Sequence, residues 1–191
     1  ALFGKEAALF CPSGTMTNQI AIKVHTQPLD EVICDHYSHI YQYETGGYAF
    51  NSGVAINLLE GENGKITADQ VAAAIKPLYD WLPKSRLVVL ENTCNKGGGS
   101  YYTVDEIRPI RKLCQDRGLA LHLDGARLFN AIVETGESPT AIGDLFDSIS
   151  ICLSKGLGAP VGSVLIGDQA FIAQARRFRK VMGGGMRQAG Y

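Results

Sequence analysis

A lysine separates a hydrophobic run from a string of glycines in the segment SICLSKGLGAPVG, residues 150–162. Because Lys155 follows the apolar residues 151–153, the pattern places a cation at the end of a predicted buried strand. An ammonium group near a protein core costs several kcal/mol unless it is paired or deprotonated. Desolvation also lowers the pKa of a lysine and makes it a usable nucleophile. Lys155 is therefore a candidate for covalent chemistry.

Asp124 ends a second strand-like segment, LALHLD, and is followed by Gly125, Ala126 and Arg127. Strand alternation places His122 and Asp124 on the same face of the sheet. A carboxylate at a strand end beside two small residues indicates a charged acceptor with room for a flat group against it. The alternative interpretation is a surface pair between Asp124 and Arg127, which would contribute little to stability.

A third strand end leads into PSGTMTN, in which Ser13, Gly14 and Thr15 precede a predicted helix. A helix N-terminus offers free N–H groups and the positive end of the helix dipole, and Gly14 lets an anion approach the backbone closely. The segment is therefore a candidate anion site. The simpler interpretation is that Ser13 only caps the helix.

One cofactor, pyridoxal 5'-phosphate, accounts for all three strand ends. It needs a lysine for its Schiff base, an acid for its pyridine nitrogen and an anion site for its phosphate. Lys155 would supply the first group. Asp124 would keep the ring nitrogen protonated, so that the ring withdraws electrons. The phosphate would be held by Ser13, Gly14 and Thr15.

Two other kinds of site fit the sequence less well. Gly156 and Gly158 begin a GxG, but Val161 stands where a dinucleotide-binding GxGxxG needs its third glycine, and a strand follows instead of a helix. The segment CDHYSH, residues 34–39, has two histidines at a spacing that zinc accepts, but no second cluster completes a tetrahedral set. The sequence therefore predicts no metal, and His39 is interpreted as a site residue or a helix-start histidine.

The composition argues against several classes of function. The chain has 191 residues, 46% hydrophobic and 19% charged, with a net charge of −1. The sequence has no basic patch interleaved with aromatic residues, so nucleic-acid binding is not predicted. No apolar segment reaches the roughly 18 residues of a membrane span, and no signal peptide is expected. Five cysteines without a CxxC pair favour reduced thiols in a cytoplasmic protein. A basic cluster lies in a predicted helix and has two interpretations: it forms a solvated face of the helix, or it binds an anion. Its residues are Arg176, Arg177, Arg179 and Lys180.

The elements that must position these residues alternate between strand-like and helix-like segments. Expected strands cover residues 6–13, 30–35, 53–60, 85–92, 119–124, 148–154 and 161–167; expected helices cover 14–25, 38–45, 67–76, 103–117, 126–134, a segment starting at 138, and 169–182. Thr67 with Gln70, and Thr103 with Glu106, form predicted capping boxes. The alternation predicts an α/β fold, a three-layer sandwich around a mostly parallel sheet, with ligands at the carboxyl ends of the strands.

Four segments, LFCPSGTMTNQIA, HLDGARLFNA, ICLSKGLGAPVGS and RKVMGGGMRQAG, closely resemble the L-threonine aldolases of low specificity, which are fold-type-I enzymes that use pyridoxal phosphate. The resemblance covers nearly the whole chain, with the motifs in the same order. It implies that residues 1–191 form the large cofactor-binding domain, without an N-terminal segment and the small C-terminal domain. It also implies a homo-oligomer, a dimer or a homotetramer, with sites at the subunit interface.

The resemblance also assigns roles to residues. Lys155 corresponds to the lysine that binds the cofactor covalently, and Asp124 to the partner of the ring nitrogen, with Ala126 beside it. His39 matches the histidine that stacks on the ring. Further assignments are Gly14 and Thr15 at the phosphate, Arg127 near the substrate carboxylate, and Lys180 and Arg187 near the site at a subunit interface. One motif departs from the family: ENTCN replaces ENTHN, so Cys94 stands where many members have a second histidine.

The implied activity is retro-aldol cleavage of L-threonine, L-allo-threonine and other β-hydroxy-α-amino acids to glycine and an aldehyde. His39 is the candidate base for the β-hydroxyl proton, directly or through water, and stacking alone is an equally consistent role. Two alternatives stay open. Another fold-type-I enzyme, a β-eliminating lyase or an aminotransferase, would share Lys155 and Asp124. The chain would otherwise be a non-catalytic fragment that binds the cofactor.

Overall fold

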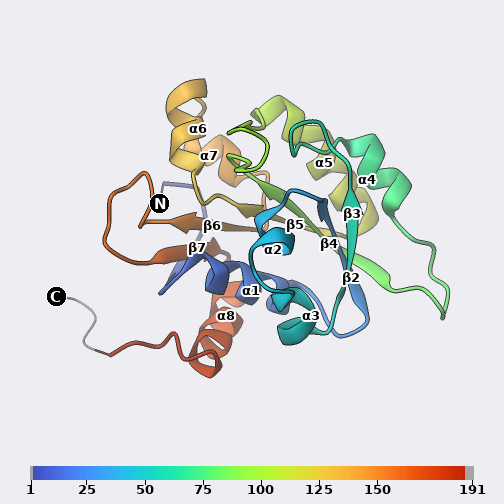
Figure 1. Cartoon of the computed structure of the whole chain (residues 1–191), viewed down its shortest axis with the longest axis horizontal. Coiled ribbons are helices and arrows are strands. Elements are labelled where there is room, and N and C mark those ends of the chain that lie inside the picture. The colour runs from blue at the N-terminus through green and yellow to red at the C-terminus, as the bar shows by residue number, and fades with distance from the viewer. Residues whose placement is uncertain (1, 188–191) are drawn as a thin grey trace.

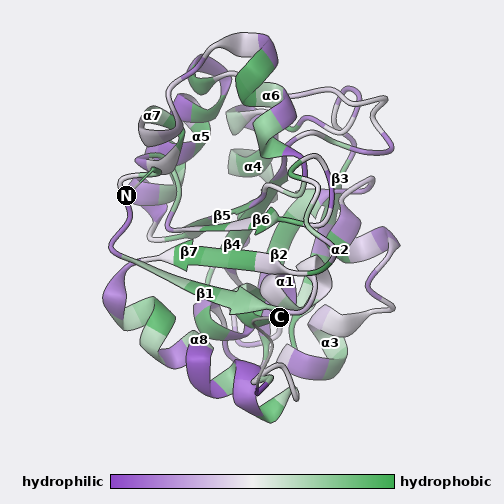
Figure 2. Cartoon of the chain, turned by 90° about the vertical axis from the view of Figure 1, so that its left-hand side faces the viewer, coloured by the Kyte–Doolittle hydropathy of each residue, from purple (hydrophilic) through white to green (hydrophobic). Residues whose placement is uncertain are grey.

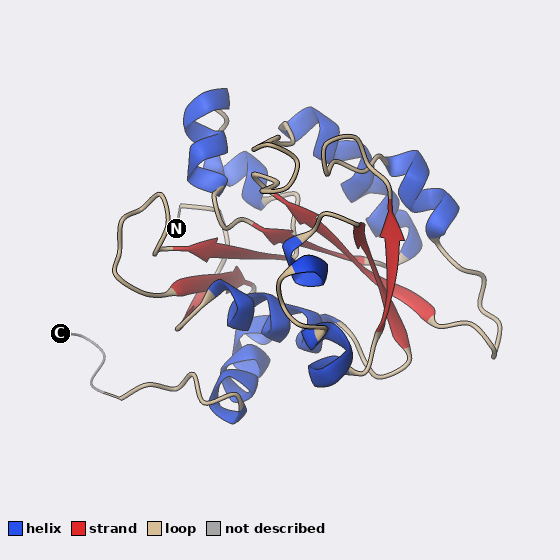
Figure 3. Cartoon of the chain, in the orientation of Figure 1, coloured by secondary structure: helices blue, strands red, loops and turns tan. Residues whose placement is uncertain are grey.

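The computed structural model describes residues 2–187 and contains one seven-stranded sheet (Figures 1 and 3). The spatial order of the strands is β1-β7-β6-β5-β4-β2-β3. Five strands pair in parallel from β6 to β3, and β7 runs antiparallel to both of its neighbours, β6 and β1. The predicted mostly parallel sheet is confirmed. Its strands are β1 Ala7–Cys11, β2 Asp30–Asp35, β3 Ala55–Leu59, β4 Lys84–Glu91, β5 Ala120–Asp124, β6 Ser148–Cys152 and β7 Ser163–Gly167.

Helices cover both faces of this sheet, which makes the predicted three-layer sandwich. One face packs against α4, α5, α6 and α7, and the other against α1, α2, α3 and α8 (Figure 1). Figure 2 shows apolar strands between helices whose outer surfaces carry hydrophilic residues. None of the helices described is long and apolar enough to cross a membrane. Their bounds are α1 Gly14–His25, α2 His39–Gln42, α3 Gly47–Ser52, α4 Ala68–Ala74, α5 Val104–Arg117, α6 Leu128–Thr135, α7 Pro139–Gly143 and α8 Gln169–Val181.

The helices begin where the capping residues predicted. Both capping boxes form, with the Thr67 side chain accepting the N–H of Gln70 and the Thr103 side chain accepting that of Glu106. Each box satisfies backbone donors that a helix start leaves without intrahelical partners. At the other end, α4 stops at Ala74, two residues before the predicted end, because the chain turns to an extended conformation there.

The short helix α3 was not predicted. The sequence predicted that the preceding segment ends at Gly46 and Gly47 and that a strand begins at Gly53, but the structure has a helix between Gly46 and Gly53. Gly46 before α3 and Gly53 after it both have φ of +68°, a left-handed conformation that glycine adopts at little cost. The pair lets six residues form a compact turn of helix against α1.

The strand directions bring the functional candidates to one edge of the sheet. Because β1, β2, β4, β5 and β6 all point the same way, their carboxyl ends meet at this edge. Glu91 at the end of β4 and Asp124 at the end of β5 are register partners. This is the edge at which ligands gather in open α/β sheets.

Candidate active site

Asp124 is a buried carboxylate at the end of β5, with 3% of its surface exposed. Its Oδ2 accepts a hydrogen bond from Asn18 Nδ2 at 2.7 Å, and its Oδ1 accepts the N–H of Ala126 at 3.2 Å. As predicted, His122 faces the same side and contacts α1, whereas Leu121 and Leu123 pack into the core on the opposite face. Asp124 is therefore no surface partner of Arg127, and the exposed-pair interpretation is wrong.

Glu44 lies beside Asp124 and was missed by the sequence analysis. It is 5% exposed, and its carboxylate accepts hydrogen bonds from Asn18 Nδ2 at 2.9 Å and from Gln19 Nε2 at 2.5 Å. The one amide group of Asn18 thus joins two buried carboxylates. The sequence held one signal for this, since the polar run Thr17 to Gln19 lies in the middle of a helix that has to face the sheet.

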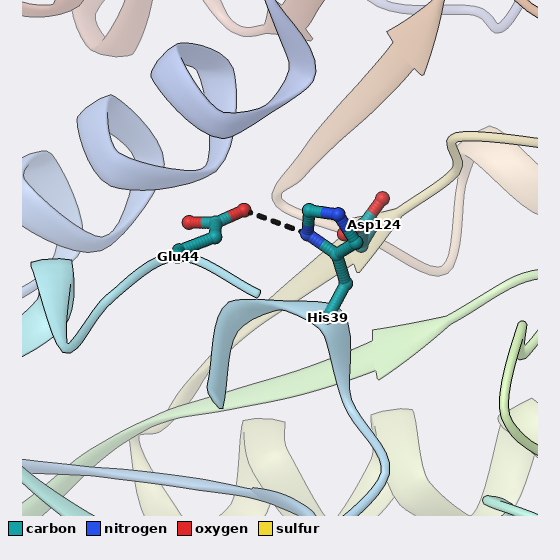
Figure 4. A group of neighbouring side chains, drawn as sticks. All are labelled: His39, Glu44 and Asp124. Carbon is teal, nitrogen blue, oxygen red and sulfur yellow. Dashed lines mark hydrogen bonds and ion pairs between the residues drawn. The ribbon is translucent and has the colours of Figure 1, made fainter. Parts of the chain in front are cut away.

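His39 completes this cluster from the start of α2 (Figure 4). Its Nδ1 lies 3.0 Å from Glu44 Oε1, and polar atoms of His39, Glu44 and Asp124 all lie within 4.8 Å of one another. The hydrogen bond to Glu44 raises the pKa of His39, and the charges of Asp124 and Glu91 act in the same direction against the effect of burial. With Nδ1 donating to Glu44, the lone pair of the neutral ring is on Nε2, which is the arrangement a general base requires.

Glu91 holds the start of α2 in place. Ser38 precedes this helix without capping it, and Glu91 Oε2 instead accepts the N–H of His39 at 2.8 Å. Its Oε1 accepts the N–H of Asn95 at 3.1 Å. Burial, and then the charge of Asp124, raise the pKa of Glu91 to about 7. Glu91 was not predicted, although it is the last residue of a buried strand that ends at this edge.

The predicted anion site lies at the start of α1, next to β6. Ser13 caps the helix by accepting the N–H of Met16, which leaves the N–H groups of Gly14 and Thr15 outside the intrahelical bonds. A Cβ at Gly14 would lie 2.7 Å from Cys152 Sγ, so only glycine allows this close approach. The helix start therefore sits against the strand that leads to Lys155.

Lys155 lies in the turn after β6, three residues beyond Cys152, and its side chain is exposed. The expectation that this lysine is desolvated is wrong for the single chain, because the buried strand ends before the lysine is reached. The structure places Lys155 at the same edge of the sheet as Asp124. Arg127, half-buried at the start of α6, and the buried Ala126 follow Asp124 at this edge as well.

Lys180 and Arg187 are not brought to the cluster. Both side chains are exposed, one in the last turn of α8 and the other in the segment after it. Among residues 2–187, neither forms a hydrogen bond or ion pair with His39, Glu44 or Asp124. Arg179 in the same basic cluster donates instead to the carbonyl of Phe10 at 2.8 Å. The end of the fourth motif, residues 188–190, lies outside the described residues.

Apart from His39, the segment CDHYSH, residues 34–39, has a structural role. Asp35 accepts the N–H groups of Tyr37 and Gly61, each at 2.7 Å, and burial raises the pKa of Cys34 to about 12. Among the described residues, the potential metal ligands that lie close together are His39, Glu44 and Asp124. Both carboxylates of this set already accept hydrogen bonds from the Asn18 amide.

The five cysteines are free and buried, and Cys94 does not act as a base in the cluster. Its Sγ packs against Gly64, where an added Cβ would come within 2.2 Å of it, and burial raises the pKa of Cys94 to about 11. A thiol in that state stays protonated near neutral pH. His39 is thus the imidazole that the described chain supplies to this cluster.

A sequence profile of beta-eliminating lyases matches residues 1–191, the whole chain. The chain belongs to the beta-eliminating lyase family. It is 43% identical to the low-specificity L-threonine aldolase of Saccharomyces cerevisiae over 191 residues, 98% of this chain and 49% of the relative. It is 41% identical to the enzyme of the same name from Escherichia coli, over 99% of this chain and 56% of the relative. The chain therefore spans about half the length of the curated relatives it matches.

Solved structures agree with this placement. The threonine aldolase of Leishmania major superimposes with a TM-score of 0.87 and 29% sequence identity, over 94% of this chain and 53% of that one. The predicted resemblance to the L-threonine aldolases and the predicted α/β fold are thus confirmed. The roles of single residues stay predictions.

Proposed function

We propose that the protein containing this chain is a pyridoxal-phosphate-dependent aldolase that cleaves L-threonine, L-allo-threonine and related β-hydroxy-α-amino acids to glycine and an aldehyde. The observation that carries the proposal is the convergence of Asp124, His39 and the helix start at Gly14 on the sheet edge from which Lys155 extends. The names of the relatives support the aldol reaction over elimination within this family.

The residues at this edge fit the cofactor. Asp124 is buried, its donors are neutral amides, and no lysine or arginine pairs with it in the described chain, so a protonated ring nitrogen would supply the missing positive partner. The N–H groups of Gly14 and Thr15 lie outside the intrahelical hydrogen bonds of α1 and would bind a phosphate there. The holding residues would be Ser13, Gly14, Thr15, His39, Asp124, Ala126, Arg127 and Lys155. When bound, the cofactor supplies an electron-withdrawing ring that accepts the electrons of the broken Cα–Cβ bond.

The other steps belong to side chains of this chain. Arg127 would bind the substrate carboxylate, because a guanidinium matches that group with two parallel hydrogen bonds. His39 would take the proton of the β-hydroxyl group at Nε2 while Nδ1 donates to Glu44. Glu44 then stabilises the imidazolium that forms, and Glu91 keeps the His39 backbone in place.

The proposal includes the oligomeric state of the protein and its location in the cell. The exposed Lys180 and Arg187 would reach the site of a neighbouring subunit in a homo-oligomer, a dimer or a tetramer. Lys155, exposed in the single chain, would become desolvated where the second subunit and the cofactor cover it. The chain would act as the large cofactor-binding domain of a cytoplasmic enzyme.

The test is a product analysis of the purified protein with pyridoxal phosphate and L-threonine. The proposal expects equal amounts of glycine and acetaldehyde, loss of activity in Lys155→Ala, and full activity in Lys112→Ala, which removes an exposed lysine from α5 on the opposite face. A keto acid with ammonia would indicate elimination instead. Amino transfer to an added keto acid would indicate an aminotransferase, and either result overturns the proposal.

A further inference from the structure

A chain of buried polar side chains leads from Asp124 to the opposite edge of the sheet. Asn18 Oδ1 lies 3.3 Å from His122 Nε2, and His122 Nδ1 lies 2.7 Å from Ser148 Oγ. Ser148 Oγ also lies 2.7 Å from Nε2 of His25, the last residue of α1. Asn18, His122 and Ser148 are each at most 1% exposed. The first member of the chain, Asn18, donates to Asp124.

The hydrogen bonds of Asn18 favour one arrangement of protons along this chain. The carboxylates of Asp124 and Glu44 accept hydrogen bonds only, so the Asn18 group that faces both must be its NH₂. The amide oxygen of Asn18 then faces His122, whose Nε2 must carry the proton. Flipping the Asn18 amide would place its oxygen against two carboxylates.

Ser148 extends the assignment of protons from His122 to His25. In neutral His122 a proton on Nε2 leaves a lone pair on Nδ1, so the Ser148 hydroxyl donates to it. That hydroxyl has no second proton, and His25 Nε2 must therefore donate to Ser148 Oγ. Burial lowers the pKa of His122 to about 3 and that of His25 to about 4, so both rings are neutral near pH 7, although the charges of Asp147 and Asp168 face His25.

We propose that Asn18, His122, Ser148 and His25 form a fixed proton arrangement, with both histidines protonated at Nε2, that makes Asn18 a positioning residue for Asp124. The histidine holds the amide oxygen, so the amide N–H groups stay on the two carboxylates. Oδ2 of Asp124 is thereby always occupied by the same donor. The proton arrangement is a property of the chain itself, whereas the use of Asp124 to bind a ring nitrogen rests on the proposed function.

The direct test is solid-state ¹⁵N spectroscopy of the purified protein labelled at histidine, which reports the protonated nitrogen of each imidazole. The proposal expects His122 and His25 to be neutral and protonated at Nε2, with and without pyridoxal phosphate. A proton on Nδ1 of His122 overturns it. This measurement needs no activity. The proton arrangement can therefore be correct when the proposed function is wrong, and the proposed function can be correct when the proton arrangement is wrong.

Two serines of β6 provide a matched pair of variants. Ser148 and Ser150 are both fully buried, face α1 and are hydrogen-bonded to it, Ser150 through Thr17 Oγ1 at 2.5 Å. Ser148→Ala should move the His122 Nδ1 and His25 Nε2 signals, while His122 keeps its Nε2 proton because Asn18 still accepts it. Ser150→Ala should move neither signal. Equal changes in both variants would contradict the proposal, and if Ser148→Ala fails to fold, the wild-type spectrum alone decides.

The effect on Asp124 is tested with Asn18→Ala in the enzyme loaded with cofactor. Loss of a hydrogen bond to a charged group should lower kcat about tenfold or more, with a smaller change in KM, and should change the pH dependence of the visible cofactor absorbance. Ser150→Ala is again the control and should leave the absorbance profile unchanged. An Asn18→Ala enzyme with the wild-type absorbance profile would remove Asn18 from its positioning role.

Discussion

The buried carboxylate of Glu91 predicts an unusual dependence of stability on pH. Its pKa is raised from the usual 4.5 to about 7 in the folded protein, mainly by burial. Between these values the folded state holds more protons than the unfolded state, so the free energy of unfolding falls as pH rises. The loss is complete once the pH is above the folded value. This sign is opposite to that of a carboxylate whose pKa is lowered by a cation.

The size of the effect follows from the two pKa values. Each pH unit between them is worth about 1.4 kcal/mol, so ionised Glu91 costs about 3 kcal/mol above pH 7. Glu91→Gln removes this cost and keeps one oxygen to accept an N–H from His39 or Asn95. The variant loses the second of these two hydrogen bonds, which lowers its free energy of unfolding by about 1 kcal/mol. The variant should therefore match the wild type near pH 5 and exceed its stability by about 2 kcal/mol at pH 8.

The assay is urea unfolding of both proteins at pH 5 and pH 8, at one protein concentration, followed by circular dichroism. Glu106→Gln is a suitable control, because this exposed carboxylate lies in a capping box and ion pair far from the cluster and its pKa is lowered. Relative to the wild type, Glu106→Gln should not gain stability as pH rises. If Glu91→Gln changes the free energy of unfolding equally at both pH values, Glu91 is not the group that titrates near neutrality and the reasoning is refuted.

Three further predictions concern packing, the base and a cap. Gly14→Ala should lose about 1–3 kcal/mol of stability because its Cβ meets Cys152 Sγ, and adding Cys152→Ala should restore most of it in thermal unfolding; no restoration would refute the contact. Glu44→Gln should lower the pKa of His39, so the activity should reach its plateau at a lower pH; an unchanged pH–rate profile excludes His39 as the base. Thr103→Ala should cost about 1 kcal/mol in urea unfolding, and an unaltered midpoint would show that the cap contributes nothing.

Local patterns were enough to predict most of the fold. Capping residues such as Thr67 and Thr103 fix helix starts through bonds within a few residues, and apolar alternation fixes the strands. The parallel order then places the strand ends at one edge, which is why the sequence could bring Asp124 and the helix start at Gly14 to the same edge. The helix α3 was missed because Gly46 indicates the end of one segment and Gly53 fits the start of the expected strand 53–60, which leaves the six residues between them without a pattern of their own.

The polar contacts of the site could not be predicted in the same way. Glu44 meets Asn18, and Glu91 meets the backbone of His39, only because distant segments are packed together. The sequence indicates where to look, at the polar run Thr17 to Gln19 and at the end of a buried strand, but not which segments meet there. The exposure of Lys155 was mispredicted for a related reason: the apolar run before it predicts where the strand is buried, whereas the cover over the following turn must come from other groups.

The central claim is that Lys155 holds pyridoxal phosphate opposite Asp124. Borohydride reduction of the purified protein with bound cofactor, followed by peptide mass spectrometry, tests it most directly, because reduction makes the link to the lysine permanent. We expect the phosphopyridoxyl mass on the peptide that contains Lys155, and no such label after Lys155→Ala. A label on a different lysine, or a protein that takes up no cofactor, would contradict the account.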